Sequence, residues 1–279
     1  MTDLFGNKES IRGVPMIRIQ QVKLPIDHTD EDLFIKAADA LRLNTEDIKR
    51  LHIFRKSIDA RIKDEISFIY TLDVDTDKEI KISKRNTNVS QVEPFVYDVK
   101  ATGETPLNNR PVVVGSGPAG LFCALLLAEK GYNPIILERG KKMKERVKDV
   151  EKFWREGILN VNTNIHFGEG GSGTFSDGKL DTLMKDSSKR GIKVLDELVE
   201  AGSPLEISYL NKPHIGTDIL RNVFVNIRKK IIALGGTFRF EECVKDINIK
   251  DNRIYRVITE SDIIETDVLV LAIGHSARD

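Results

Sequence analysis

The sequence predicts an α/β protein in which a small α+β unit precedes a domain built around a parallel sheet. Two observations carry this prediction. Near the start of the chain, strand-like and helix-like patterns follow one another in the order β-α-β-β. Further on, the continuous apolar run Val112–Val114 is followed by a glycine-rich turn, an apolar helix and a second apolar strand, which is the order found in parallel sheets.

The first unit is predicted to cover residues 1–100. Residues 16–24 alternate apolar and polar like a half-buried strand, and residues 30–43 carry apolar side chains at helical spacing. Two further strands are expected at 51–60 and 66–74, on either side of a turn at Lys63-Asp64. Residues 101–110 are rich in turn formers and poor in apolar side chains, which predicts a linker before a second domain over 111–279.

Composition limits the classes of function. The 279 residues are 40% hydrophobic, enough for a sizeable core, and 43 basic residues balance 43 acidic ones. No overall charge therefore attracts nucleic acid or an anionic membrane, and any charged ligand must be held locally. The longest apolar run, 121–128, is too short to span a bilayer, and the first residues lack an apolar signal core, so we expect a cytoplasmic protein with no membrane partner. The only cysteines, Cys123 and Cys243, are far apart in sequence, which argues against a disulfide scaffold.

The strongest signal lies in residues 111–140, PVVVGSGPAGLFCALLLAEKGYNPIILERG. Gly115, Gly117 and Gly120 fit the G-x-G-x-x-G pattern of a dinucleotide site, in which they allow a tight turn, close approach of a pyrophosphate and close packing of the helix. The helix adds free amides and the positive end of its dipole. Glu138 ends the second strand, 18 residues after Gly120, where a carboxylate accepts hydrogen bonds from ribose and repels a 2′-phosphate. The pattern favours FAD or NAD over NADP.

A second glycine-rich stretch, GEGGSGTFSDGKL, occupies residues 168–180, and five of its thirteen residues are glycine. Such a loop loses much backbone entropy on ordering, so we expect it to close around the same ligand as the first glycine turn. A P-loop beginning at Gly173 is the alternative, but Leu180 stands where magnesium requires Ser or Thr, and no apolar strand immediately precedes the loop. The amides expected near the pyrophosphate or flavin are those of Gly170, Gly171, Ser172, Gly173 and Thr174.

The form Gly-Ser-Gly-Pro-Ala-Gly followed by Glu138-Arg139 resembles the FAD site of glutathione-reductase-like flavoproteins. Residues 237–242, 244–249 and 254–259 are predicted strands, and 267–274 a buried strand running into glycine. Together they resemble the three-stranded meander and returning strand of the same flavoproteins, whose Rossmann-like FAD-binding domain would cover 111–279 here. By this resemblance the meander offers backbone groups to adenine. The cofactor-binding residues that it implies are Gly115, Ser116, Gly117, Pro118, Ala119, Gly120, Glu138, Arg139, Val244, Ala272 and Gly274.

A closer resemblance spans nearly the whole chain. The loop at 168–180, the stretch 55–61 (RKSIDAR) and the stretch 212–218 (KPHIGTD) resemble a group of bacterial and archaeal proteins described as FAD-dependent oxidoreductases or dehydrogenases. The resemblance implies bound FAD and flavin-mediated electron or hydride transfer, with NAD(P)H a candidate donor in a full-length parent; it brings no known substrate. Because the relatives continue beyond residue 279, we expect a fragment or a shortened chain, incomplete at its carboxyl end and inactive alone.

No catalytic side chain is assigned, because flavin itself carries the redox chemistry. We expect Lys179 to be solvated, and His166, His214 and His275 to be hydrogen-bonded structural residues instead of bases. Arg146 is expected on a solvated helix face instead of at the cofactor phosphates. No histidine spacing suggests a zinc site.

Two alternative functions stay open at this point. In the first, the amino-terminal unit recognises a partner and the flavin is structural or regulatory; interspersed acidic residues make a solvated surface the better interpretation than a nucleic-acid site. In the second, the chain is an NAD-binding dehydrogenase without flavin, which would be colourless. The small-molecule substrate is not identified in either case. The basic residues that make an RNA test of the first alternative worthwhile are Lys49, Arg50, Arg55, Lys56, Arg61 and Lys63.

Overall fold

The computed structural model describes residues 16–83, 85–93, 95, 97, 99, 103–176, 178, 186–211 and 213–278. The chain divides into two compact units. The first contains the described residues among 1–100, 181–195 and 205–213, and the second those among 101–180, 196–204 and 214–279. The sequence-based division assigned 205–213 to the second domain. Here the amide of Lys56 donates to the carbonyl of Tyr209 at 2.9 Å, so that this segment adds to a strand of the first unit.

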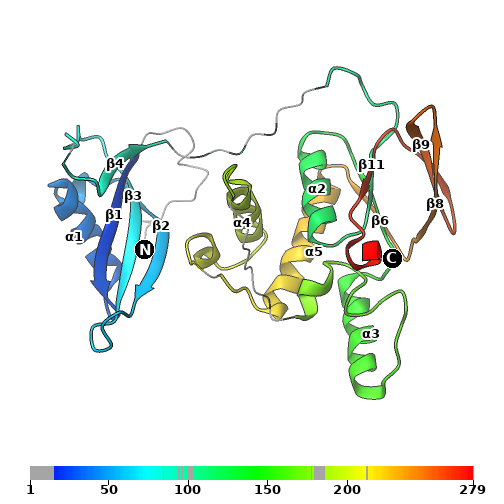
Figure 1. The fold of residues 1–279 in the computed structure, drawn as a ribbon, viewed down its shortest axis with the longest axis horizontal. Helices are drawn as coiled ribbons and strands as arrows, with labels where there is room; N and C mark the ends of the chain where they lie inside the picture. Colours follow the sequence, from blue (N-terminus) through cyan, green and yellow to red (C-terminus); the bar gives the residue numbers. More distant parts are fainter. Residues whose placement is uncertain are drawn as a thin grey trace. The chain divides into compact units, whose positions relative to one another are not determined.

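The first unit contains a four-stranded antiparallel sheet packed against helix α1 (Figure 1). Its strand order is β2-β3-β1-β4, so β3 and β1 are central. The predicted β-α-β-β order is present, and β4 is a further edge strand that the sequence analysis did not predict. The elements are β1 (Met16–Pro25), α1 (Asp30–Leu41), β2 (Arg50–Asp59), β3 (Ser67–Asp75) and β4 (Val89–Val92).

Helix α1 begins at a capping box. The amide of Thr29 donates to the Asp32 carboxylate at 2.8 Å, and the amide of Asp32 donates to the Thr29 hydroxyl at 3.4 Å. The helix ends at Arg42, which adopts the left-handed conformation with φ 58°. Its apolar face packs on the sheet and closes the core of this unit. The buried core residues include Leu33, Phe34, Ala37, Ala38 and Leu41 of the helix and Ile19, Leu24, Leu51, Tyr70, Leu72 and Val74 of the sheet.

The second unit contains a parallel sheet with the strand order β11-β5-β6-β7. Residues 237–242 were predicted in the meander, but β7 pairs in parallel with β6, because helix α5 carries the chain back across the sheet. The strand predicted over 267–274 is shorter than expected and lies at the sheet edge, where Leu271 is 56% exposed. The elements are β5 (Val112–Val114), α2 (Pro118–Glu129), β6 (Ile135–Glu138), α5 (Thr217–Ala233), β7 (Thr237–Phe240) and β11 (Leu269–Leu271).

The meander is formed by β8 (Val244–Lys250), β9 (Arg253–Thr259) and the unpredicted β10 (Ile263–Glu265). It lies on one side of the parallel sheet, and α2 and α5 lie together on the other (Figure 1). The core between meander and sheet is formed by Val112, Ile135, Leu137, Val257 and Ile264.

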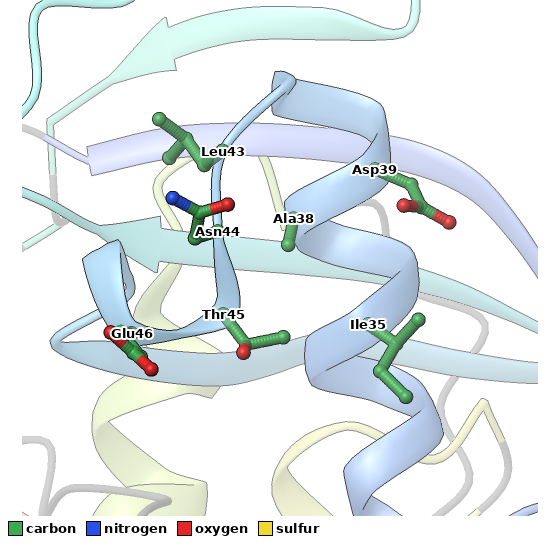
Figure 2. Close-up of a pocket in the computed structure, with 7 residues that line it drawn as sticks. All are labelled: Ile35, Ala38, Asp39, Leu43, Asn44, Thr45 and Glu46. Carbon is green, nitrogen blue, oxygen red and sulfur yellow. The ribbon is translucent and has the colours of Figure 1, made fainter.

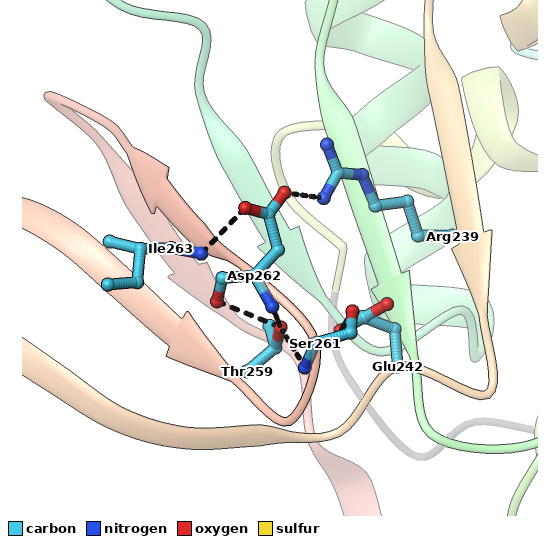
Figure 3. A network of polar contacts seen from close by, with 6 residues as sticks. All are labelled: Arg239, Glu242, Thr259, Ser261, Asp262 and Ile263. Carbon is cyan, nitrogen blue, oxygen red and sulfur yellow. Dashed lines mark hydrogen bonds and ion pairs between the residues drawn. The ribbon is translucent and has the colours of Figure 1, made fainter.

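A polar network joins the meander to β7 (Figure 3). The guanidinium of Arg239 donates to Asp262 at 2.6 Å, and the hydroxyl of Ser261 donates to Glu242 at 2.7 Å. The amide of Asp262 donates to the Thr259 hydroxyl at 2.9 Å, which closes the tight turn between β9 and β10. Hydrogen bonds from Thr259 and Ser261 hold the pKa of Glu242 below its ordinary value. The meander is thereby fixed next to the carboxyl end of β7.

The second unit contains a further helix, α3 (Met143–Glu156), which ends at Gly157 with φ 71°. The boundary between the two units falls within α4 (Arg190–Glu200). Among the helices that the structure describes, none is long and apolar enough to cross a membrane. Short 3₁₀ turns are η2 (Thr45–Asp47), η3 (Ser172–Phe175), η4 (Leu205–Ser208) and η5 (Gly274–Arg278).

Candidate functional site

The first glycine turn connects β5 to α2, and two of its glycines are sterically required. Gly115 has φ +100°, and a Cβ there would collide with the carbonyl oxygen of Ala272, which follows β11. A Cβ on Gly120 would collide with the carbonyl oxygen of Gly115. Glycine at these positions therefore lets β5, α2 and the end of β11 approach one another closely.

The start of α2 offers unpaired backbone donors. Gly117 is the N-cap and Pro118 the first helical residue, and no side chain caps this end. The first intrahelical bond runs from the amide of Leu121 to the carbonyl of Gly117 at 2.9 Å. The amides of Ala119 and Gly120 precede it and have no acceptor within the helix. Together with the helix dipole, they form an environment that suits an anion.

The second glycine loop lies directly against the first. The amide of Gly170 donates to the carbonyl of Ser116 at 2.9 Å. A Cβ on Gly171 would lie 3.1 Å from the Cδ of Pro118 and 3.2 Å from the Cα of Gly117. Positive φ angles of 83° and 67° at Gly170 and Gly171 produce this close approach. The two sequence motifs, about 50 residues apart, thus lie against each other and form one candidate site.

Glu138, at the end of β6, is 5% exposed and ties the loops together. One carboxylate oxygen accepts from the amide and the hydroxyl of Ser116 at 2.9 and 2.7 Å. The other accepts from the amides of Gly140 and Gly168 at 2.8 and 3.1 Å. A carboxylate has about four acceptor positions, and all are engaged here. The predicted contact of Glu138 with a ribose stays a prediction, and the structure adds this second role.

Glu169 is a site residue that the sequence analysis missed. Its carboxylate is completely buried and forms an ion pair with Arg228 of α5, with 2.6 Å between Oε1 and Nε. The other oxygen accepts from the amide of Met143, the first residue of α3, at 2.6 Å. It therefore caps α3 and fixes the second glycine loop to α5. The available signal was a single carboxylate embedded among glycines.

Arg146 contradicts the expectation of a solvated helix face. It lies on α3 but is 0% exposed, and its guanidinium donates to the carbonyl oxygens of Asn164, Ile165, Gly168, Glu169 and Gly171. The loop carbonyls that point inward need donors, and this one side chain supplies them. Burial lowers the pKa of Arg146 to about 10, an effect that the carboxylates of Glu138 and Glu169 oppose.

Arg139 follows Glu138 and lies beside a small aromatic cluster. Its guanidinium carbon is 4.1 Å from the centre of the Phe167 ring, and Nη2 donates to the Oδ1 of Asn162 at 3.0 Å. Among the residues that the structure describes, none is a hydrogen-bond partner of the buried Nε of Arg139. The rings of His166 and His275 stack nearby, with centres 4.4 Å apart. The loop before the second glycine stretch and the turn after β11 thus converge on Arg139.

The other predicted residues are placed as follows. Val244 begins β8, and its side chain packs against the core between meander and sheet. Gly274 begins η5 with φ 54°. Gly173 lies in η3, and no atom lies within 4 Å of a Cβ built on it. His214 is described and has an interaction partner, whereas Lys179 lies outside the described residues.

A pocket of about 450 Å³ lies within the first unit, not at the glycine loops (Figure 2). It lies between one side of α1 and the segment that follows this helix. Its lining includes two carboxylates and no basic side chain, so its chemistry is unsuited to a phosphate. The lining residues are Ile35, Ala38, Asp39, Leu43, Asn44, Thr45 and Glu46.

Comparison with known families identifies the domain that carries the first glycine turn. Residues 113–154, from β5 to within α3, match the family described as the NAD(P)-binding Rossmann-like domain. The second unit contains a Rossmann-like domain. The match confirms the predicted dinucleotide-binding fold and includes the first glycine turn and Glu138. Residues 16–75 of the first unit match a domain of unknown function, DUF8436.

Among curated proteins, one from Clostridium beijerinckii, described as uncharacterized, is 44% identical over 265 residues. The match covers 94% of this chain and 49% of that protein, so the chain spans about half the length of the relative. The match therefore extends over both units of this chain.

Solved structures similar to the chain include THI4 from Thermovibrio ammonificans, which is 17% identical with a TM-score of 0.39, covering 61% of this chain and 58% of that one. Glycine oxidase from Bacillus cereus is 15% identical with a TM-score of 0.32, covering 59% and 55%. Thioredoxin reductase from Lactococcus lactis is 14% identical with a TM-score of 0.32, covering 59% and 35%. The family match over 113–154 identifies the Rossmann-like domain independently of these distant likenesses.

Proposed function

We propose that the Rossmann-like domain binds FAD and that the protein is an oxidoreductase that transfers electrons or hydride through this flavin. The observation that carries the proposal is the hydrogen bond from the amide of Gly170 to the carbonyl of Ser116. It places two glycine loops side by side. A Rossmann-like domain needs only the first loop to hold a pyrophosphate, so the second loop favours a larger ligand that both loops enclose.

The diphosphate is proposed to lie in a crevice between the two loops. The amides of Ala119 and Gly120 in the first turn of α2, which have no acceptor within the helix, would hold its oxygens. Nothing lies within 4 Å of a Cβ built on Gly173, so the second loop leaves room there for close approach of a pyrophosphate. A Cβ built on Gly117 would be in ordinary contact with the Cα of Gly171 at 3.9 Å, so the second loop borders the first at that glycine. When bound, FAD would supply the hydride or electron transfer.

Further contacts are proposed from position. Glu138 would accept a ribose hydroxyl in exchange for the Ser116 hydroxyl, which can rotate away while the three backbone donors stay in place. The buried and unpaired Nε of Arg139 offers a donor at the same end of the sheet. Val244 would contact adenine through its backbone, and the turn from Ala272 to Gly274 would pass close to the cofactor. These contacts support FAD because they extend beyond the first glycine turn.

The test is a titration of the cofactor-free chain with FAD, NAD⁺ and NADP⁺ by isothermal calorimetry. The proposal predicts that FAD binds most tightly and that NADP⁺ binds least, because the carboxylate of Glu138 repels the 2′-phosphate. Binding of NAD⁺ without binding of FAD would overturn the flavin assignment and leave an NAD-dependent dehydrogenase. The matched family is described as NAD(P)-binding, and this observation favours an NAD-dependent dehydrogenase as the second candidate function.

A nucleic-acid partner is not proposed for the first unit, because several of its basic side chains have internal partners. Arg61 forms a bidentate pair with Asp59 at 2.8 Å, and Arg55 donates to Asn211 at 3.0 Å. The ammonium of Lys56 lies 3.9 Å from the centre of the Phe68 ring. Engaged cations of this kind are less available to a phosphate backbone. The substrate is proposed to be a small molecule.

A further inference from the structure

The guanidinium of Arg146 organises the backbone of the second glycine loop. Nη1 donates to the carbonyl oxygen of Glu169 at 2.5 Å and to that of Gly171 at 2.9 Å. Nη1 also contacts the hydroxyl of Thr174 at 3.0 Å, and that hydroxyl donates to the same Gly171 carbonyl at 2.7 Å. A residue buried at 0% exposure thus determines the direction of several peptide groups.

The direction of each carbonyl determines the direction of the next amide. In a planar trans peptide the C=O of one residue and the N–H of the next point in opposite directions. The carbonyl of Glu169 points to Arg146, and the amide of Gly170 donates in the other direction to the first glycine loop. The carbonyl oxygen of Gly171 also accepts a hydrogen bond from Arg146. The amide N–H of Ser172 belongs to the same peptide group, so it points away from the guanidinium. Gly171 lies against Gly117 and Pro118 at the start of α2.

The side chain of Arg146 also explains why residue 168 is a glycine. It has φ +115°, and a Cβ there would lie 2.5 Å from the Cδ of Arg146. The glycine therefore allows the arginine to pass beneath the loop. The buried cation also adds positive potential below the crevice, where Coulomb interactions are less screened than in water.

We propose that Arg146 is a positioning residue for the pyrophosphate of the cofactor. Without touching the ligand, it holds the Gly171–Ser172 peptide with its N–H toward the crevice and attaches the second loop to the first through Gly170. The inference rests on the proposed function, since it assumes that the crevice binds a dinucleotide. It makes a charged side chain of α3 a determinant of cofactor affinity.

The experiment compares wild type with Arg146→Met and Arg146→Lys, using FAD and ADP as separate probes in calorimetric titrations. ADP keeps the pyrophosphate and lacks the flavin. We expect Arg146→Met to weaken FAD and ADP by the same factor, roughly ten- to hundredfold. We expect Arg146→Lys to restore part of the affinity, because lysine keeps the charge but cannot reproduce the fork of donors.

Two control variants separate positioning from general stability. Arg155→Met lies on the exposed face of the same helix and should leave both affinities unchanged. Val150→Ala removes buried volume from α3 and should lower the melting temperature without a matching loss of ADP affinity. The phosphorus NMR resonances of bound ADP report on the pyrophosphate surroundings directly. They should shift in Arg146→Lys and stay as in wild type in Val150→Ala.

Unchanged ADP and FAD affinities and unchanged phosphorus resonances in the Arg146 variants would overturn the inference. If Arg146→Met does not fold, the affinities of Arg146→Lys for ADP and FAD and its phosphorus resonances test the inference. A loss of affinity in Val150→Ala as large as in the Arg146 variants would also overturn it, since the effect would then follow stability. A wild-type chain that binds neither FAD nor ADP would contradict the proposed function itself, which is a distinguishable result.

Discussion

The amide nitrogen of Gly170 lies 2.9 Å from the carbonyl oxygen of Ser116, so the two glycine loops are hydrogen-bonded to each other. The carboxylate of Glu138 reinforces this contact, because it accepts from Ser116 in one loop and from Gly168 in the other. Loops so rich in glycine would be costly to order individually. Their mutual bonds, and the buried charges of Arg146 and Glu169, supply the compensation.

Replacing Glu138 with glutamine should destabilise the second unit. The side-chain amide would present a donor to backbone amides or to Ser116, which are donors themselves. We expect a loss of about 1–3 kcal/mol in the free energy of unfolding, measured by urea denaturation. Glu260→Gln is the control, because its pair with Lys245 is exposed. Equal stability of the two variants would refute the role of Glu138 as the link between the loops.

Replacing Glu169 with glutamine should lower the free energy of unfolding more than replacing Glu138 does. It would leave the guanidinium of Arg228, which is 17% exposed, without its carboxylate partner. Breaking a buried pair by removing one charge costs about 3–5 kcal/mol. The matched control is Glu151→Gln, whose exposed pair with Arg155 at 3.4 Å is worth about 0–1 kcal/mol. Thermal unfolding followed by circular dichroism measures both, and similar small losses would argue against a buried pair.

Two glycine substitutions separate packing from ligand contact. Gly120→Ala should destabilise the domain by about 1–3 kcal/mol, because the new methyl group collides with the carbonyl of Gly115. Gly173→Ala should leave stability within about 0.5 kcal/mol, because nothing lies within 4 Å of the new methyl group. Its affinity for FAD should nevertheless fall if the loop lies against the cofactor. Wild-type affinity in folded Gly173→Ala would show that the ligand does not pass there.

The elements predicted from sequence are those whose signals are local. Strand β1, helix α1 and the β5-α2-β6 unit follow the predicted patterns because periodicity, capping residues and glycine turns act over a few residues. Strands β4 and β10, with four and three residues, are too short to show a period. Strand β7 was grouped with the meander, but it pairs with β6. This pairing depends on the crossover through α5, which no local sequence pattern reveals.

The site divides in the same way. The glycine spacing predicted the first turn. The glycine content of the second loop predicted that it closes around the same ligand, and this stays a prediction. Arg146 and Glu169 could not be predicted, because in sequence they look like ordinary charged residues of a helix and a loop. Their burial follows from the inward-pointing carbonyls of the loop and from Arg228, about 60 residues further along the chain.

The first unit should lose stability in strong alkali. Burial raises the pKa of both Tyr70 and Tyr209 to about 12, from an ordinary value of 10.0. The folded state therefore keeps these phenol protons between pH 10 and 12 while the unfolded chain releases them, so stability is fully present below pH 10 and falls as pH rises through 12. Tyrosinate absorbance should show two late ionisations, each removed by Tyr70→Phe or Tyr209→Phe. Completion of the titration near pH 10 would contradict this account.

The most direct test of FAD binding is the visible absorption spectrum of the purified chain, with mass identification of whatever heat releases from it. Flavin bands and released FAD are expected, because the two bonded glycine loops are proposed to enclose one dinucleotide. A colourless chain that takes up no added FAD would contradict this proposal, and titration with NADH would then show whether the Rossmann-like domain holds a nicotinamide dinucleotide instead.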